Sequence, residues 1–210
     1  MQCGECVFAP NSFAGSINDR GHIVGYSDWA VATTPDPDGP ILQGVHAFLW
    51  QNGEMADLGA LGDGSYSSAN GLNNADEVVG NTLVGSVNTA FLYAGGQMHN
   101  LGNLGHHADL DSSANGINDR REIVGWSAVR LAANGSVVQR AFLYSFGHMR
   151  DLNTLIDHRS ALSGRVKLTN AMAINCNGWI AASGYDVRSG KAHVYLLRRH
   201  GGERRECRHP

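Results

Sequence analysis

Three side chains with metal-binding chemistry alternate in the segment HHADLD at residues 106–111. His107, Asp109 and Asp111 are each separated by one residue, so an extended backbone would place them on one side. Imidazole and carboxylate groups bind divalent metals, which makes the trio a candidate metal site. The matching loop one unit earlier, GDGSYS, keeps Asp63 but has no histidine. This difference favours a solvated loop, so we expect no cofactor, with a divalent metal such as calcium as the alternative.

Aromatic residues outside the apolar strand pattern form a second candidate site. Tyr26, Tyr66 and Trp126 could stack on sugar rings, and Asp63 could hydrogen-bond the same ligand. Aromatic rings also pack between sheets, and that structural role is the more common one. We therefore take these four residues as candidate ligand-binding residues, with packing as the competing explanation.

The sequence contains no assembled catalytic set. It has no Gly-x-Ser-x-Gly motif, which would mark an activated serine, and its ten histidines are scattered. Polar pairs such as Asn18-Asp19 and Asn118-Asp119 could present a ring of polar groups, although turn closure explains them more simply. The residues thus favour a protein that is not an enzyme.

A sequence motif of about 15 residues occurs four times along the chain. SANGINDRREIVGWS at 113–127 is preceded by versions at 14–27 and 68–82 and followed by a divergent one at 171–184. Each version has an asparagine anchor before an aliphatic run; the anchors are Asn18, Asn73, Asn118 and Asn175. Aliphatic runs bounded by Asn, Asp and Gly are typical of short strands around a turn, which Asn can close with its side chain.

A second phrase follows each copy of the first. It reads HAFLWQNGEMADLG at 46–59 and recurs at 89–102 and 140–153, while the fourth unit keeps HVYLL at 193–197. The pattern predicts a strand, a glycine turn and a returning strand. Because strand side chains alternate, Phe91 and its counterparts should face away from the neighbouring Ala and Leu.

Two hairpins per unit and four units predict an all-β fold, specifically a β-propeller-like array of four repeated four-stranded units. The expected units span about 11–59, 60–102, 103–153 and 154–207 of a single repeat domain. A β-solenoid is the competing architecture, and residues 153–163 could form a short helix. Residues 1–10, with the apolar stretch 5–9, are expected to supply a strand that closes a small ring, before a basic tail at 198–210.

Composition and cysteine spacing limit the function classes. The net charge of −3 gives no basic footprint for nucleic acid, and no apolar run reaches the roughly 18 residues of a membrane helix. Cys3 and Cys6 have C-x-x-C spacing without a second tight pair, so a disulfide to Cys207 or plain thiols are favoured over zinc. The first ten residues do not read as a secretory signal.

The repeated phrases resemble the bacterial HAF repeat, named for the triplet seen here as His46-Ala47-Phe48. The resemblance covers about residues 13–197 and rests on two phrases that recur in the same order. It implies a propeller-like all-β protein that is secreted or on the cell surface, and it implies no activity and no catalytic residues. The tail, the divergent fourth unit and Cys176 depart from the pattern.

These observations predict a non-catalytic binding or interaction module of propeller type, with a glycan or a surface protein as partner. A metal-dependent hydrolase or lyase using the loop at 106–111 is one alternative. A structural fragment that completes a larger ring with partner chains is the other. We expect a monomer or small homo-oligomer that binds neither nucleic acid nor membranes by a spanning segment.

Overall fold

The computed structural model describes residues 11–32, 41–62 and 64–198, and the side chains of residues 30–43 are outside that description. The described chain is all-β, as the sequence predicts, and it forms four antiparallel sheets. The predicted closing strand at 5–9, the basic tail and Asp63 lie outside the described residues. Each predicted unit contains one sheet.

The sheets are called sheets 1 to 4 in chain order. Sheet 1 comprises β1 (Ser12–Ile17), β2 (Ile23–Ala32), β3 (Ile41–Gln51) and β4 (Glu54–Asp57). Sheet 2 comprises β5 (Ser67–Leu72), β6 (Val78–Val84), β7 (Val87–Ala94) and β8 (Gln97–Gly102). Sheet 3 comprises β9 (Ser112–Ile117), β10 (Ile123–Arg130), β11 (Val137–Ser145) and β12 (His148–Asp151). Sheet 4 comprises β13 (Val166–Ile174), β14 (Ile180–Asp186) and β15 (Ala192–Leu197).

Every sheet is a meander in which consecutive strands pair antiparallel. Sheets 1 to 3 have the four strands that the repeated hairpins predict. Sheet 4 has three in the described residues, and the predicted fourth strand of the last unit lies outside them. The sequence after β15 lacks the Met and Leu of the returning strand, so it does not carry the apolar pattern of β4, β8 and β12.

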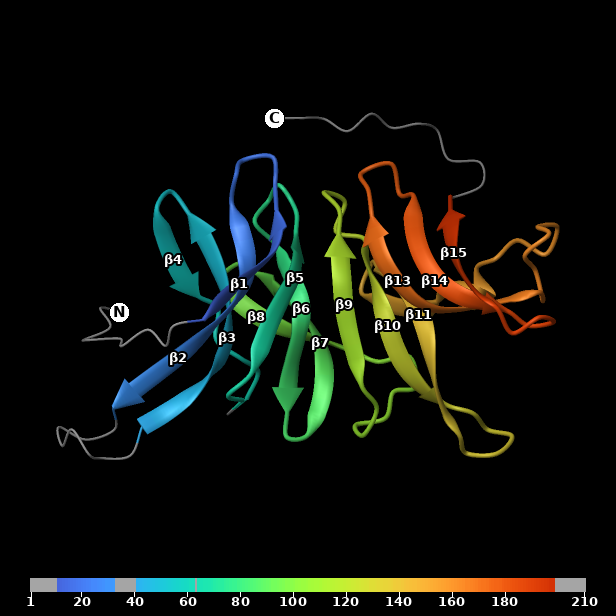
Figure 1. Ribbon diagram of the computed structural model, residues 1–210, viewed down its shortest axis with the longest axis horizontal. Helices are drawn as coiled ribbons and strands as arrows, with labels where there is room; N and C mark the ends of the chain where they lie inside the picture. Colours follow the sequence, from blue (N-terminus) through green and yellow to red (C-terminus); the bar gives the residue numbers. More distant parts are fainter. Residues whose placement is uncertain (1–10, 33–40, 63, 199–210) are drawn as a thin grey trace.

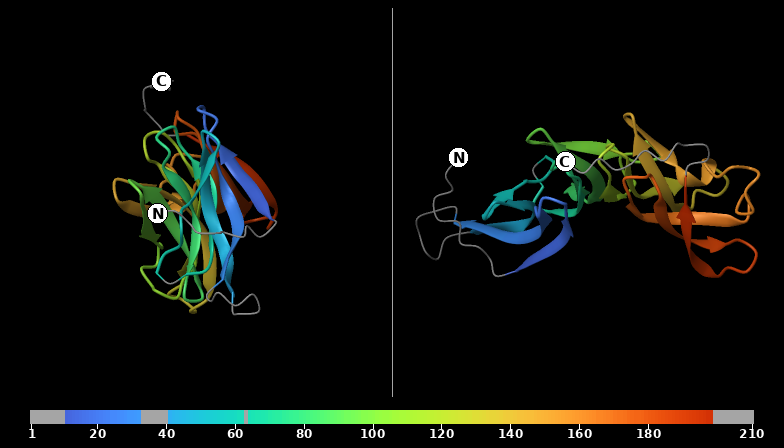
Figure 2. Two further views of the ribbon diagram at one scale, coloured as in Figure 1. Left: turned by 90° about the vertical axis from the view of Figure 1, so that its left-hand side faces the viewer. Right: turned by 90° about the horizontal axis from the view of Figure 1, so that it is seen from above.

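The four sheets stand side by side in chain order, with sheets 1 and 4 at the two ends of the row (Figures 1 and 2). The first strand of each sheet packs on the sheet before it: β5 on sheet 1, β9 on sheet 2 and β13 on sheet 3. The substantial contacts between sheets in the described ranges join consecutive sheets. Within these ranges the row is open, and the predicted small ring is not closed.

Three apolar clusters fill the junctions between neighbouring sheets. Phe91 and Phe142 are completely buried and take part in the first and second junctions. Their neighbours Leu92 and Leu143 take part in the following junctions. The prediction that Phe and its neighbours face opposite sides of the sheet is therefore confirmed, and each sheet contributes one face to the junction on each side.

A bulge in the first strand of each repeat explains a glycine that follows the aliphatic pair. The register shifts between Ala69 and Gly71, opposite Gly80. A Cβ added to Gly80 would lie 1.9 Å from the carbonyl oxygen of Ser68, and one on Gly125 would lie 2.0 Å from that of Ser113. No side chain fits at such distances, so glycine is required by the close approach of two backbones.

The helical content of the described residues is one 3-10 turn, η1 (Leu152–Thr154), at the start of the segment where a short helix was considered. Asp151 caps this turn by accepting a hydrogen bond from the Asn153 backbone. Among the described residues there is no helix with the length and apolar character needed to cross a membrane.

Replacing Phe142 with Ala should lower the free energy of unfolding by about 3–5 kcal/mol, because a fully buried ring leaves a cavity between sheets 2 and 3. Chemical denaturation monitored by far-UV circular dichroism measures the change. Phe146→Ala is the matched control, since that ring is 91% exposed and its loss should change stability by less than about 0.5 kcal/mol. Equal effects of the two changes would contradict the assignment of strand faces.

Candidate functional site

The four asparagine anchors close four equivalent turns, which we call the asparagine turns: 18–22, 73–77, 118–122 and 175–179. The Asn118 side-chain oxygen accepts hydrogen bonds from the backbone N–H groups of Arg120 and Glu122, both at 3.0 Å. Asn18, Asn73 and Asn175 accept the same two bonds at the same distances. The predicted role of asparagine in turn closure is confirmed.

The fourth position of every asparagine turn has a left-handed backbone. It holds Gly21 and Gly178 in the first and last turns, and Asp76 and Arg121 in the two middle turns. Asp76 and Arg121 have φ of 59° and 61°, a conformation that residues other than glycine rarely adopt. The turn geometry is therefore set by the asparagine hydrogen bonds rather than by glycine.

The same asparagines join neighbouring sheets. The Asn18 amide donates to the Asn73 carbonyl oxygen at 3.1 Å, and Asn73 donates to that of Asn118 at 3.3 Å. Asn118 donates to the Asn175 carbonyl oxygen at 3.1 Å. The four turns consequently form a continuous row along one edge of the array, whereas the sequence analysis favoured simple turn closure over a shared polar arrangement. A repeated Asn at one register position is the signal that could have indicated it.

The residues after the anchors make a second polar line on this edge. The backbone N–H of Asn74 donates to Asp119 at 2.8 Å, and its side chain donates to Asp119 at 3.1 Å and to Asp19 at 2.9 Å. The Asp19 backbone in turn donates to the Asn74 side-chain oxygen at 3.0 Å. Asn74 thus bridges two carboxylates from different sheets and holds them in fixed positions.

Ion pairs stabilise the same edge. The Asp76 carboxylate pairs with the Arg20 guanidinium of the preceding sheet at 3.1 Å. The ring nitrogen Nδ1 of His22, from the same sheet, is within hydrogen-bond distance of that carboxylate at 2.7 Å. Glu77 is largely buried and pairs with Arg121 of the following sheet. Burial alone would raise the pKa of the Glu77 carboxyl, but hydrogen bonds from Arg121 and Asn73 outweigh it and lower that pKa below its ordinary value. Glu77 is therefore held as a carboxylate.

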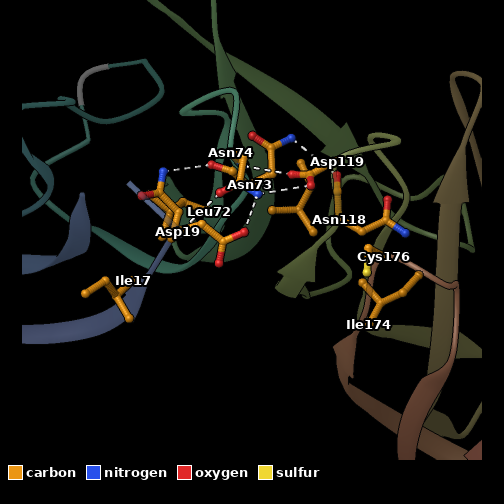
Figure 3. A pocket seen from close by; sticks show the side chains of 11 residues that line it. Ile17, Asp19, Leu72, Asn73, Asn74, Asn118, Asp119, Ile174 and Cys176 are labelled. Atoms are coloured by element: carbon orange, nitrogen blue, oxygen red, sulfur yellow. Dashed lines mark hydrogen bonds between the residues drawn. The ribbon is translucent and has the colours of Figure 1, made fainter. Parts of the chain in front are cut away.

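An open pocket of about 170 Å³ lies along the asparagine row (Figure 3). One aliphatic side chain from each unit lines it, namely Ile17, Leu72, Ile117 and Ile174. The anchors Asn18, Asn73 and Asn118 and the polar residues Asp19, Asn74, Asp119 and Cys176 line the rest. The volume is below the roughly 300 Å³ at which pockets for drug-sized ligands begin, so the pocket suits part of a small polar ligand.

The three residues of the predicted metal site, His107, Asp109 and Asp111, make separate contacts with other parts of the chain. Asp109 pairs with Arg130 at 2.7 Å, and the Asp111 carboxylate accepts the backbone N–H of Asn88 at 2.9 Å. His107 is exposed, and its carbonyl oxygen accepts the Asn103 amide. The described residues contain no group of three His, Cys, Asp or Glu side chains that could hold a metal ion.

The predicted aromatic residues lie on different sheets. Tyr26 is on β2 and stacks on Phe13 with ring centroids 4.9 Å apart. Trp126 occupies the equivalent position on β10, half-buried opposite Ala141. Tyr66 precedes β5, where its carbonyl oxygen accepts a hydrogen bond from Thr82. The structure does not bring these three rings together.

A histidine–carboxylate pair in the first unit was missed by the sequence analysis. His46 on β3 and Asp57 on β4 are on adjacent strands, and the His46 ring nitrogen Nδ1 lies 3.0 Å from both carboxylate oxygens of Asp57. Burial would raise the pKa of Asp57, but hydrogen bonds from His46 and Gly59 lower it. Arg140 and Asp151 occupy the same positions in sheet 3, 3.9 Å apart. A pair that recurs as Arg–Asp is best explained as a cross-strand contact.

Cys176, which lines the pocket, is disulfide-bonded. The other three cysteines of the chain, Cys3, Cys6 and Cys207, lie outside the described residues, and so does the predicted disulfide between the chain ends. The Arg120 guanidinium donates to the Cys176 carbonyl oxygen, which adds a further contact between sheets 3 and 4 on this edge.

Asn118→Ala should lower the free energy of unfolding by about 2–4 kcal/mol, because it removes four hydrogen bonds of a buried side chain. The Asn118 amide donates to the Glu122 carboxylate and to the Asn175 carbonyl oxygen, and its side-chain oxygen accepts from two backbone N–H groups. Asn175→Ala should cost about 1 kcal/mol, because Asn175 closes its turn but donates to no residue in the described ranges. Urea denaturation of both variants measures the difference. Equal losses would show that the links between sheets contribute little.

Stability should fall at acidic pH partly through Glu77. Its folded pKa is lowered, so the stabilisation is present above the ordinary value of 4.5 and is lost as pH falls below it toward the folded value. Glu77→Gln should therefore reduce the slope of stability against pH in that range, by at most one proton. Thermal denaturation from neutral to acidic pH measures the slope. Glu54→Gln, at an exposed position, should leave it unchanged.

Comparisons of this chain with protein-family models, with curated proteins and with solved structures found no match.

Proposed function

We propose that this chain is a non-catalytic binding module of propeller type, and that the asparagine row is its ligand-binding edge. The observation that supports this proposal is the convergence of the same turn from all four units on one pocket. Ligand-binding pockets combine apolar lining with a few precisely placed polar groups, and this pocket has both. Binding residues are found disproportionately on loops that a rigid scaffold positions.

A glycan is the ligand class that best fits this edge. Asp119 and Asp19 are fixed by Asn74, so their carboxylates are positioned before any ligand arrives. Carboxylate and amide groups in fixed positions can accept and donate hydrogen bonds to the hydroxyl groups of a sugar. The aliphatic side chains Ile17 and Ile117 line the same pocket and can contact the apolar face of a ring. A protein surface carrying such glycans is the natural partner.

The resemblance to HAF repeats supports a secreted or cell-surface location for this function. That environment also suits the disulfide at Cys176, because disulfides persist where the surroundings are oxidising. Location and ligand are proposed together, since a glycan-binding module would meet its ligand outside the cell.

Glycan-array binding of the purified chain, with and without calcium, tests the proposal. We expect at least one class of glycan to bind and Asp119→Ala to weaken that binding at least roughly tenfold, the effect of losing a charged hydrogen bond. Asp109→Ala is the control, since Asp109 lies in the 106–111 loop and pairs with Arg130. Absence of any bound glycan, or equal effects of the two variants, would count against the sugar ligand.

Metal analysis of the purified protein distinguishes the enzyme alternative. A stoichiometric metal that is present in the wild type and missing in His107→Ala would favour a metal-dependent hydrolase or lyase over the binding module. The proposal expects equal, substoichiometric metal content in both proteins.

A further inference from the structure

The two ends of the row expose positions that are buried wherever two sheets meet. Each internal junction joins the rear face of one sheet to the front face of the next, where the front face is the one that packs on the preceding sheet. Sheet 1 has no preceding sheet in the described chain, and sheet 4 has no following one (Figure 1). The front face of sheet 1 and the rear face of sheet 4 are therefore unpartnered.

The rear face of sheet 4 carries aliphatic side chains at the positions that are buried on the rear face of sheet 3. Strand register places Val194 and Leu196 at the positions of Ala141 and Leu143. Ala141 and Leu143 are 0% and 7% exposed, whereas Val194 and Leu196 are 77% and 63% exposed. Two large aliphatic side chains thus stand in water at positions that pack against a neighbouring sheet elsewhere in the molecule.

The front face of sheet 1 carries apolar residues at positions that are buried on the front face of sheet 3. Ile17 corresponds to Ile117, which is 7% exposed in the junction between sheets 2 and 3, but Ile17 is 64% exposed. Met55 corresponds to Met149, which packs in that same junction, and is itself exposed. Both end faces therefore carry apolar groups of the kind that already fit one another three times within the chain.

Polar groups at the two ends are complementary as well. Asn175 closes the last asparagine turn without donating to any described residue, whereas each earlier anchor donates to the next carbonyl. Ser67 and Ser112 each accept a backbone N–H of the preceding sheet and donate to one of its carbonyl oxygens. Ser12, at the same register position of sheet 1, is exposed.

From these observations we infer that the chain assembles head to tail with a second copy of itself, the rear face of sheet 4 packing on the front face of the second copy's sheet 1. Asn175 then donates to the Asn18 carbonyl of the second copy, and Ser12 of that copy takes the role of Ser67. Two copies contribute eight sheets, which is within the usual size of propellers, so two such junctions can close a ring. The inference holds whatever ligand the asparagine row binds.

Two charge variants test the junction by damaging one end each. Ile17→Asp changes the front face and Leu196→Asp the rear face, and both side chains are exposed, so the folded monomer should keep its circular dichroism and melting temperature. Size-exclusion chromatography with light scattering should show the wild type above the 22.4 kDa of one chain. Each variant alone should be monomeric, with a dissociation constant raised roughly 100-fold or more by burial of an unpaired charge.

Mixing the two variants is the decisive measurement. Each variant keeps one intact end, so the pair can form one sound junction and should associate, although neither associates alone. Val137→Asp is the control, because Val137 is 52% exposed at the start of β11 in sheet 3, which is at neither end of the row, and the change should leave the wild-type mass unchanged. A symmetric interface between identical faces would give no rescue on mixing and would overturn the inference.

A monomeric wild type would also overturn it. Failure of glycan binding has no bearing on this result, because mass and mixing are measured without any ligand.

Discussion

The structure depends on the burial of sheet faces against neighbouring sheets. A meander of four short strands has two apolar faces and cannot cover either by itself, so each unit becomes stable only beside another. Phe142 and Leu143 illustrate this dependence, because adjacent residues of one strand enter two different junctions. Burial of a Phe or Leu side chain is worth about 1.5–3 kcal/mol, and three junctions repeat that contribution. The two end faces have no neighbouring sheet in the described residues, which is why they are candidates for contact with a second copy.

Hydrogen bonds at the asparagine turns set the position of each sheet relative to the next. Apolar faces alone would permit sliding, since hydrophobic burial has no direction. The amide of each anchor fixes the register, because it reaches one carbonyl oxygen of the following turn. One residue type therefore closes a local turn and joins two units. The edge that results is polar, preorganised and repeated, which is why it is the best candidate for ligand binding.

The proposed ligand edge and the proposed self-association share Ile17 and the end anchors of the asparagine row, but they depend on different properties of the molecule. The asparagine row has its polar groups satisfied within the chain and offers fixed carboxylates such as Asp119 to a ligand. The end faces have apolar side chains such as Leu196 exposed to solvent. Assembly would extend the asparagine row from one copy to the next, so association and binding would support each other.

The sequence by itself determined the units, their strands and the closing role of asparagine, because these follow from alternation of side chains and from hydrogen bonds within five residues of an anchor. It also indicated that Phe91 and Phe142 face away from the Ala and Leu beside them on the strand. Only the tertiary structure decided that the turns meet in one row, that Tyr26 and Trp126 stay on separate sheets, and that the row is open in the described residues. Those outcomes depend on the angle and distance between sheets, which arise from packing across about 45–57 residues of chain and leave no local pattern.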